Sequence, residues 1–453
     1  MKPHFIISII LAAVSIQVAP AYSQVAPSQF GIVPNGSYES YQVEAVNLQN
    51  LSDIIKIPLF SLPQLGRLSL SFSVVANTTY WQPDEYCTTD GYSCTYYYTF
   101  QGPAYAGFSG IGPEIVADDS AIVLPEFYAA PIDCADSPIV GYPLPNIPNC
   151  YSTIWTVYDS TGGSHPLYYD ANNPSNLRTT DGSGYLFQSG ESAPWNHYYL
   201  GSSDGPPDSL LSTPTLIDSK GISSTSSSNS AVQKDPDGNT IITDSQITDS
   251  VGRHIPFIPA PTSSTAGCPN LGGQYQATTG SSTWNVPGAN NSTSTYLICY
   301  TQIAYRTSFL ADGTIYGEDP SGNNYEITYE DAVGSNQVIQ SIVLPDGSYW
   351  GFLYDAADPN NSNSVGYATM TKMVFPEGGS VQYSYINPGS VACNVQTYPT
   401  LYLQQRTVND ANGHSYLWQY GLGRSTDPNG NDSVVTYQGP SYGGCSPSAE
   451  KRP

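Results

Sequence analysis

Strand-like alternation of apolar and polar residues recurs along the chain. The segment from Arg67 to Val74 alternates strictly between polar and apolar side chains, the period of two required by a strand with one buried and one solvated face. Apolar residues between Val43 and Pro63 fall into pieces of strand length, and the same signature returns at Tyr325 to Tyr329, Tyr349 to Tyr354 and Val381 to Tyr385. The pattern predicts a protein built mainly of β-strands.

A turn of the form Asp-x-x-Gly, or a shortened version of it, separates many of these strands. In such a turn the Asp side chain caps the loop, a Pro presets φ near −65°, and Gly supplies the positive φ that closes a hairpin. Each copy therefore predicts a hairpin tip. The copies are Asp159–Gly162, Asp181–Gly184, Asp218–Gly221, Asp235–Asn239, Asp249–Arg253, Asp319–Asn323, Pro345–Ser348, Pro376–Gly379, Asp410–Gly413 and Asp427–Asn431.

Together the strands and turns predict an all-β fold of antiparallel sheets made of stacked hairpins. We expect a β-sandwich-like N-terminal region at residues 24–200, with a loop-rich insertion stapled by disulfides, and an array of hairpins at residues 235–453. The Ser- and Pro-rich residues 201–234 are expected to form a flexible stretch between them. Alternatively, this stretch is a decorated loop within one continuous sheet.

The N-terminus has the pattern of a secretory signal peptide. Lys2 precedes an apolar run from Phe5 to Val18, and small residues follow at Ala21 and Ser23. We expect residues 1–23 to be removed after Ser23 and the chain to be secreted or held at the cell surface, touching the membrane only during export. A retained anchor is the alternative, but the apolar run is shorter than the roughly 20 residues that a bilayer span needs.

An exported chain with an even number of cysteines is expected to form disulfides. Connectivity is open among about 105 arrangements for eight cysteines, and no Cys-x-x-Cys pair or histidine cluster favours a structural zinc site. Pairing of sequence neighbours is the working interpretation: Cys87 with Cys94, Cys134 with Cys150, Cys268 with Cys299, and Cys393 with Cys445.

Charge excludes one class of partner. Lys and Arg number 13 against 37 Asp and Glu, which gives a net charge of −24 and argues against binding to a nucleic-acid backbone. Tyr alone contributes 37 residues. The clusters Tyr96, Tyr97, Tyr98 and Tyr198, Tyr199 could stack on sugars, although packing between strands is the favoured interpretation of these rings.

Evidence for catalysis in the sequence is weak. Gly201–Gly205 matches a nucleophile elbow formally, but two prolines follow at once and exclude the helix that such a site needs. A polysaccharide hydrolase would need two carboxylates held across a sugar, yet most Asp residues stand at turns with a structural role. His165, His197, His254 and His414 are scattered and are interpreted as surface or strand residues.

The turn Asp235–Asn239 is superficially similar to a calcium loop, because oxygen-bearing side chains alternate along it. The further acids of an EF-hand loop are missing. We therefore expect no cofactor and no dedicated metal site, with Ca²⁺ binding only adventitiously at the acidic surface; an ordinary capped turn is the simpler interpretation.

The tyrosine-rich strands and their turns resemble the RHS, or YD-repeat, family of secreted and surface proteins. Tyr420–Asn431 follows the family consensus most closely, Val343–Asp355 resembles segments that precede such repeats, and Val46–Pro63 resembles the N-terminal strand region of these proteins. The turn residues that carry the resemblance are Asp235, Gly238, Asn239, Gly252, Arg253, Asp319, Gly322, Asn323, Asp346, Gly347, Gly423, Arg424, Asp427, Gly430 and Asn431.

The resemblance implies a hairpin shell, often followed by a C-terminal effector released at closely spaced Asp-Pro-x-Gly elements. Here those elements begin at Asp235, Asp319 and Asp427, far apart, and the copy at Tyr420 is one residue short. We expect an N-terminal portion or truncated relative with few degenerate repeats and no effector. The expected function is non-enzymatic: scaffold, shell segment, or surface adhesion and carbohydrate binding. The alternative is a secreted polysaccharide hydrolase.

Overall fold

The computed structural model describes residues 37–48, 51–77, 81–87, 93–100, 112–118, 121–127, 153–170, 173–188, 215–226, 230–288, 290, 292–308, 314–318, 324–386, 401–421 and 423–434. Every named element within them is a β-strand, and the strands form antiparallel sheets apart from one parallel pair. The predicted all-β fold is therefore confirmed. The expected signal peptide lies outside the described residues, among which no helix could cross a bilayer.

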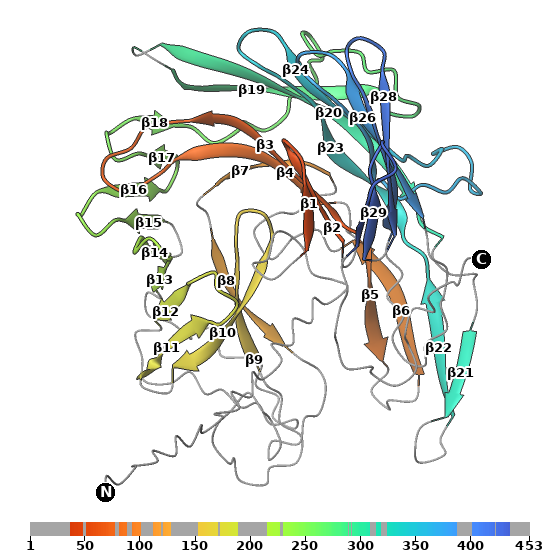
Figure 1. Ribbon diagram of the computed structural model, residues 1–453, viewed down its shortest axis with the longest axis horizontal. Helices are drawn as coiled ribbons and strands as arrows, with labels where there is room; N and C mark the ends of the chain where they lie inside the picture. The colour runs from red at the N-terminus through yellow and green to blue at the C-terminus, as the bar shows by residue number, and fades with distance from the viewer. Residues whose placement is uncertain are drawn as a thin grey trace, which may run out of the picture.

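A five-stranded sheet and a ten-stranded sheet face each other at the centre of the molecule (Figure 1). The five-stranded sheet contains, in spatial order, β1 (Tyr38–Ser40), β2 (Glu44–Asn47), β3 (Asp53–Ser61), β4 (Ser71–Asn77) and β7 (Glu114–Ala117). The ten-stranded sheet contains β19 (Thr278–Pro287), β20 (Thr293–Arg306), β23 (Val333–Val343), β24 (Tyr349–Tyr354), β25 (Met370–Val374), β26 (Ser380–Ile386), β27 (Tyr402–Asn409), β28 (Ser415–Gly421), β29 (Arg424–Thr426) and β30 (Asp432–Val434).

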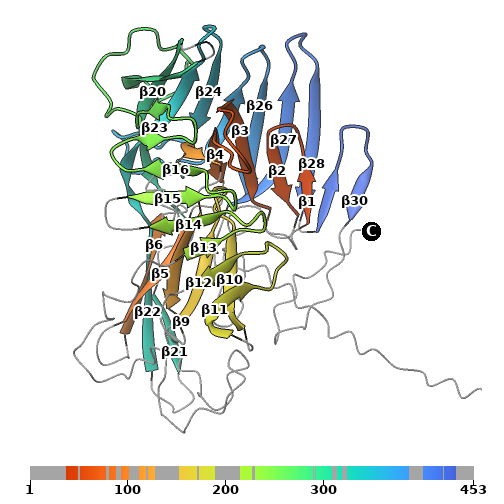
Figure 2. The ribbon, with the colours of Figure 1, turned by 90° about the vertical axis from the view of Figure 1, so that its left-hand side faces the viewer.

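An eleven-stranded sheet forms one flank, and its strands follow one another in sequence order as a ladder (Figure 2). The strands are β8 (Ile122–Phe127), β9 (Thr153–Tyr158), β10 (Ser164–Asp170), β11 (Asn173–Thr179), β12 (Leu186–Gln188), β13 (Thr215–Ile217), β14 (Ser223–Ser226), β15 (Ala231–Lys234), β16 (Thr240–Thr243), β17 (Ile247–Thr248) and β18 (His254–Ile255). The strands β13 to β15 lie within residues 201–234 and continue the ladder from β12 to β16.

A four-stranded sheet lies on the opposite side of the molecule from this ladder (Figure 1). It brings together two hairpins that are far apart in the sequence, joined by the parallel pairing of β22 with β6. Its strands, in spatial order, are β21 (Thr314–Glu318), β22 (Asn324–Glu330), β6 (Ser93–Phe100) and β5 (Trp81–Cys87).

Many hairpin loops share one backbone pattern. The first residue's N–H donates to the carbonyl four residues on, and the N–H of the fourth residue, a Gly, donates back to the first residue's carbonyl. The Gly has φ between +81° and +91°, as expected of a three-residue loop closed by a glycine bulge. The loops begin at Asp159, Asp218, Asp235, Asp249, Leu344, Phe375, Asp410 and Asp427.

Where the loop begins with Asp, the carboxylate caps it. Oδ1 of Asp410 accepts the N–H groups of Asn412 and His414 at 2.8 and 2.9 Å, and Asp427 caps its own loop in the same way. The loop at Asp181 is longer, with positive φ at both Gly182 and Gly184. The predicted turn at Asp319 lies outside the described residues, although β21 and β22 on either side of it pair as a hairpin.

The main core lies between the five- and ten-stranded sheets. The rings of Phe60 on β3 and Phe72 on β4 stack at 4.9 Å, and each lies 5.3 Å from Trp284 of β19. Phe60 also lies 5.3 Å from Tyr296 of β20. Apolar residues of the ladder, Ile222, Ile241, Ile247 and Ile255, join the same cluster. Burial of this continuous apolar surface is the main driving force that holds the sheets together.

A buried ion pair also joins the two facing sheets. Glu44 of β2 and Arg406 of β27 are each 4% exposed. The Glu44 carboxylate accepts hydrogen bonds from Arg406 Nε at 3.0 Å and from Tyr383 Oη of β26 at 2.7 Å. The guanidinium lies between the rings of Tyr41 and Trp418, 3.9 and 4.7 Å from their centroids. Both charges are therefore compensated inside the protein.

Asp53 of β3 lies in the same buried region. Burial raises its pKa well above the ordinary range, and the charge of Glu44 adds to this, while Arg406 opposes it. The raised pKa favours the neutral form of Asp53 beside the buried pair of Glu44 and Arg406.

One predicted disulfide is confirmed. Cys268, in the segment before β19, is bonded to Cys299 of β20. In the four-stranded sheet, the backbone of Cys87 on β5 lies directly opposite Cys94 on β6, a register that suits the expected bond between them. The cysteines at 134, 150, 393 and 445 lie outside the described residues.

We predict that the central ion pair is worth far more than a surface pair. Arg406→Met leaves the Glu44 carboxylate buried without its cation and should lower the free energy of unfolding by about 3–5 kcal/mol. Arg424→Met is the matched control, because the Arg424–Asp432 pair is exposed, and should cost less than about 1 kcal/mol. Urea unfolding measures both, and equal losses would contradict the buried-pair account.

A second prediction isolates the conformational demand of the loops. A Cβ added at Gly238 meets no atom within 4 Å, so Gly238→Ala tests the φ of +91° alone. It should cost about 1–2 kcal/mol. At Gly421 a Cβ also meets nothing, and no left-handed φ is required there. Gly421→Ala should change the free energy of unfolding by less than about 0.5 kcal/mol, and a cost like that of Gly238→Ala would disprove the interpretation.

Candidate functional site

The structure does not test the tyrosines selected from the sequence. Tyr96, Tyr97 and Tyr98 lie on β6 of the four-stranded sheet, and their side chains are outside the described part of the structure, as are Tyr198 and Tyr199 altogether. The described turn residues are spread over hairpin tips of different sheets. Two other places gather polar side chains: a network around His165 and a pocket beside Tyr275.

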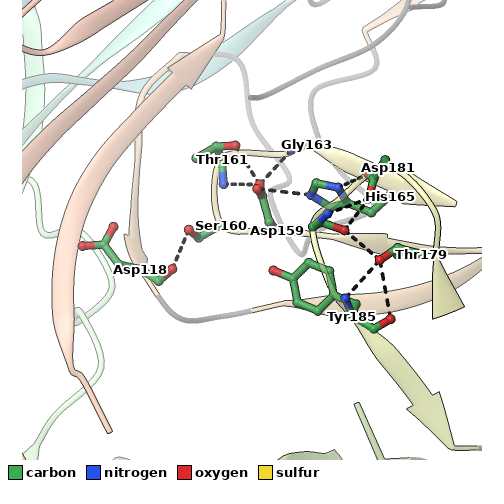
Figure 3. A network of polar contacts seen from close by, with 10 residues as sticks. Asp118, Asp159, Ser160, Thr161, Gly163, His165, Thr179, Asp181 and Tyr185 are labelled. Atoms are coloured by element: carbon green, nitrogen blue, oxygen red, sulfur yellow. Dashed lines mark hydrogen bonds and ion pairs between the residues drawn. The ribbon is translucent and has the colours of Figure 1, made fainter. Parts of the chain in front are cut away.

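His165 lies on β10 between two hairpin loops of the ladder (Figure 3). Its Nδ1 is 2.7 Å from Asp181 Oδ2, and its Nε2 is 3.4 Å from Asp159 Oδ2. The other oxygen of each carboxylate caps its own loop, through the N–H and hydroxyl groups of Thr161 and Ser183. The imidazole therefore joins the β9–β10 loop to the β11–β12 loop.

The electrostatics of this network fix its protonation. Burial alone would lower the pKa of His165, but the hydrogen bonds and charges of Asp159 and Asp181 outweigh burial and raise it to about 9. Burial likewise opposes, but does not prevent, a fall in the pKa of Asp181 to about 2. At neutral pH His165 is thus a cation with both N–H groups directed at carboxylates, and it has no lone pair with which to accept a proton.

A cavity of about 290 Å³ lies beside this network, and Asp118, Asp159 and Asp218 are among its lining residues. Each carboxylate has a structural partner. Asp118 pairs with Lys56 at 2.8 Å and accepts the Ser73 hydroxyl at 3.0 Å. Asp218 caps its loop through the N–H of Lys220 and of Ile222. The hydroxyl of Ser160 donates to the carbonyl of Asp118 rather than to His165, so the imidazole does not activate Ser160.

The second pocket has a different chemistry. It has a volume of about 470 Å³ and lies where the segment before β19 meets β20, β23 and the loop after β24. We call it the Tyr275 pocket. Amide and hydroxyl side chains, glycine backbone and one aromatic ring form its wall: Asn270, Gly272, Gly273, Tyr275, Gln276, Ala277, Thr278, Thr279, Gln302, Gln340 and Pro359.

Buried amides hold the floor of this pocket in place. The Gln276 side chain donates from Nε2 to the carbonyl of Tyr354 at 2.7 Å and accepts the N–H of Tyr354 at 2.9 Å. It thereby imitates a β-bridge at the point where β24 shifts register. Gln340 donates to the Gln276 carbonyl and accepts the Thr278 hydroxyl. Buried hydrogen-bond networks of this kind restrain the side chains that form them.

Tyr275 adopts a left-handed conformation, with φ of +58°. This conformation is costly for a bulky side chain and is found where the surroundings impose it, often at ligand sites. Tyr275 is 42% exposed, and its hydroxyl donates to Asp358 Oδ2 at 3.0 Å. The aromatic face is thus held at the surface in one orientation.

Sequence reasoning overlooked this pocket, because Tyr275 belongs to no Tyr cluster and to no Asp-x-x-Gly turn. The available signal was the pair Gly272-Gly273 shortly before it, in a segment that begins with the disulfide-bonded Cys268. Among the described residues, no group of three His, Cys, Asp or Glu side chains could hold a metal ion.

Comparisons with known proteins add no family. No protein-family model matches the chain, and no curated protein is similar enough to count as a relative. The resemblance to YD-repeat proteins therefore rests on the strands and turns described above.

We predict that the His165 network stabilises the protein within a defined pH window. Because the pKa of His165 is about 9 when folded and near 6.5 when unfolded, its contribution is complete below pH 6.5 and is lost as the pH rises through 9. The lowered pKa of Asp181 removes its share as the pH falls from 3.8 through 2. The network should contribute most between about pH 4 and 6.5.

Urea unfolding of wild type and His165→Gln at pH 5.5 and 9.5 measures this contribution. The difference between the two proteins should shrink by up to about 3 kcal/mol at the higher pH. His414→Gln is the control. Like His165, His414 pairs with a carboxylate, here that of Asp410, but His414 is exposed. A pH-independent difference for His165→Gln would refute the charged-imidazole assignment.

Proposed function

We propose that the chain is an exported, non-enzymatic scaffold of the YD-repeat type, in which stacked hairpins form a curved wall outside the cell. The observation that carries this proposal is the repetition of one capped loop along two long sheets. Because each hairpin pairs with its neighbours, further hairpins can be added along the sheet while the fold stays the same. Its role is to present a fixed surface to other components of the cell exterior.

The use of the acidic residues supports a structural role. Asp159, Asp218, Asp410 and Asp427 cap their own loops through backbone N–H groups. A carboxylate that stabilises a loop in this way is occupied by the backbone N–H groups of that loop. A general acid or base instead needs an oxygen within reach of a substrate proton.

A secreted polysaccharide hydrolase is the second candidate, because three carboxylates line the cavity beside His165. Glycoside hydrolysis requires one carboxyl group that protonates the leaving oxygen and one that attacks or activates water. In this cavity Asp118 is paired with Lys56, and Asp159 contacts His165 and its own loop. These contacts favour the scaffold over the hydrolase.

A reducing-sugar assay separates the two functions. The scaffold proposal predicts that the purified chain releases no more sugar from a panel of polysaccharides than a heat-denatured sample does. It also predicts that Asp159→Asn lowers the free energy of unfolding by about 1–3 kcal/mol, through the loop and the contact with His165. Sugar release that disappears in a folded Asp118→Asn or Asp218→Asn variant would establish the hydrolase instead.

A further inference from the structure

The Tyr275 pocket has the size of a ligand site and walls that suit one class of ligand. Its volume of about 470 Å³ lies within the roughly 300–1,000 Å³ of typical small-molecule sites. None of the described residues that line it carries a charge; Asn, Gln and Thr side chains dominate instead. Amides offer a donor and an acceptor side by side, which matches the hydroxyl groups of a sugar, since each of them can donate and accept.

Two side-chain amides of the wall, those of Asn270 and Gln302, each keep an atom for a ligand. Asn270 Oδ1 accepts the N–H of Gly272 at 3.0 Å, and Gln302 Nε2 donates to the Ser335 hydroxyl at 3.0 Å. These bonds orient both amide groups. Within the described residues, Asn270 Nδ2 and Gln302 Oε1 make no hydrogen bond, so Asn270 keeps a donor group and Gln302 an acceptor that a ligand can use.

Tyr275 supplies the aromatic face. Its hydroxyl is anchored on Asp358, and its backbone is held in the left-handed region by a segment pinned through Gln276. Packing alone offers no reason for a large aromatic residue to be strained and exposed together. A ring that must lie flat against the apolar face of a ligand offers one.

We propose that the Tyr275 pocket binds a neutral carbohydrate, with a sugar ring stacked on Tyr275 and hydrogen-bonded to Asn270 and Gln302. Charge selects against acidic sugars. The chain carries −24, Asp358 lies next to the ring, and no cation of the described residues lines the pocket. A uronate or sialylated glycan would therefore meet repulsion without a compensating partner.

The test is a glycan-array screen of the full chain, followed by calorimetric titration of the best neutral oligosaccharide and its uronate analogue. We expect binding of the neutral sugar and at least about tenfold weaker binding of the uronate. Tyr275→Gly should abolish stacking and weaken binding by about tenfold or more, and it should be at least as stable as wild type because Gly accepts the left-handed φ.

Tyr416→Ala is the control. Tyr416 has the same 42% exposure as Tyr275 and lies on β28, outside the pocket; its replacement should leave the affinity within about twofold of wild type. Binding to no glycan overturns the proposal. So does full affinity in Tyr275→Gly, and so does a uronate affinity equal to that of the neutral sugar.

Discussion

The buried contact between Glu44 and Arg406 sets the arrangement of the central sheets. A charge can remain in an apolar interior only if it is paired and its hydrogen-bonding groups are used. Glu44 on β2 meets that condition only while β26 and β27 bring Tyr383 and Arg406 to it. The ion pair thereby fixes the register of two sheets whose apolar surfaces alone could pack in more than one way.

The ladder obeys a different constraint, which is local. Each Asp-capped loop satisfies its own backbone groups and returns the chain beside the strand that it left. The sheet can then grow by one hairpin at a time. The acidic residues in these loops contribute to the net charge of −24. The segment that forms the Tyr275 pocket departs from this pattern. It has no capped loop and is held by side-chain amides and a disulfide.

The local part of this structure could be predicted from sequence and the non-local part could not. The turns at Asp235 and Asp427 indicated hairpins, and the alternation at Arg67 to Val74 indicated a strand, of which Ser71 to Val74 lie on β4 while Arg67 to Leu70 precede it. Period and turn chemistry are properties of a few adjacent residues. By contrast, 362 residues separate Glu44 from Arg406, and 78 separate Gln276 from Tyr354. In both pairs, the sequence around one residue gives no indication of its partner. The strained φ of Tyr275 is likewise imposed by tertiary contacts and leaves no pattern in the sequence.

Hydrogen–deuterium exchange of the intact chain tests most directly whether the two central sheets are one unit. If the buried pair and the shared core join them, amides of β3 and of β26 should exchange equally slowly, through the same global opening, and should respond alike as urea is added. Exchange of β3 through a separate, lower-energy opening while β26 stays protected would contradict the account.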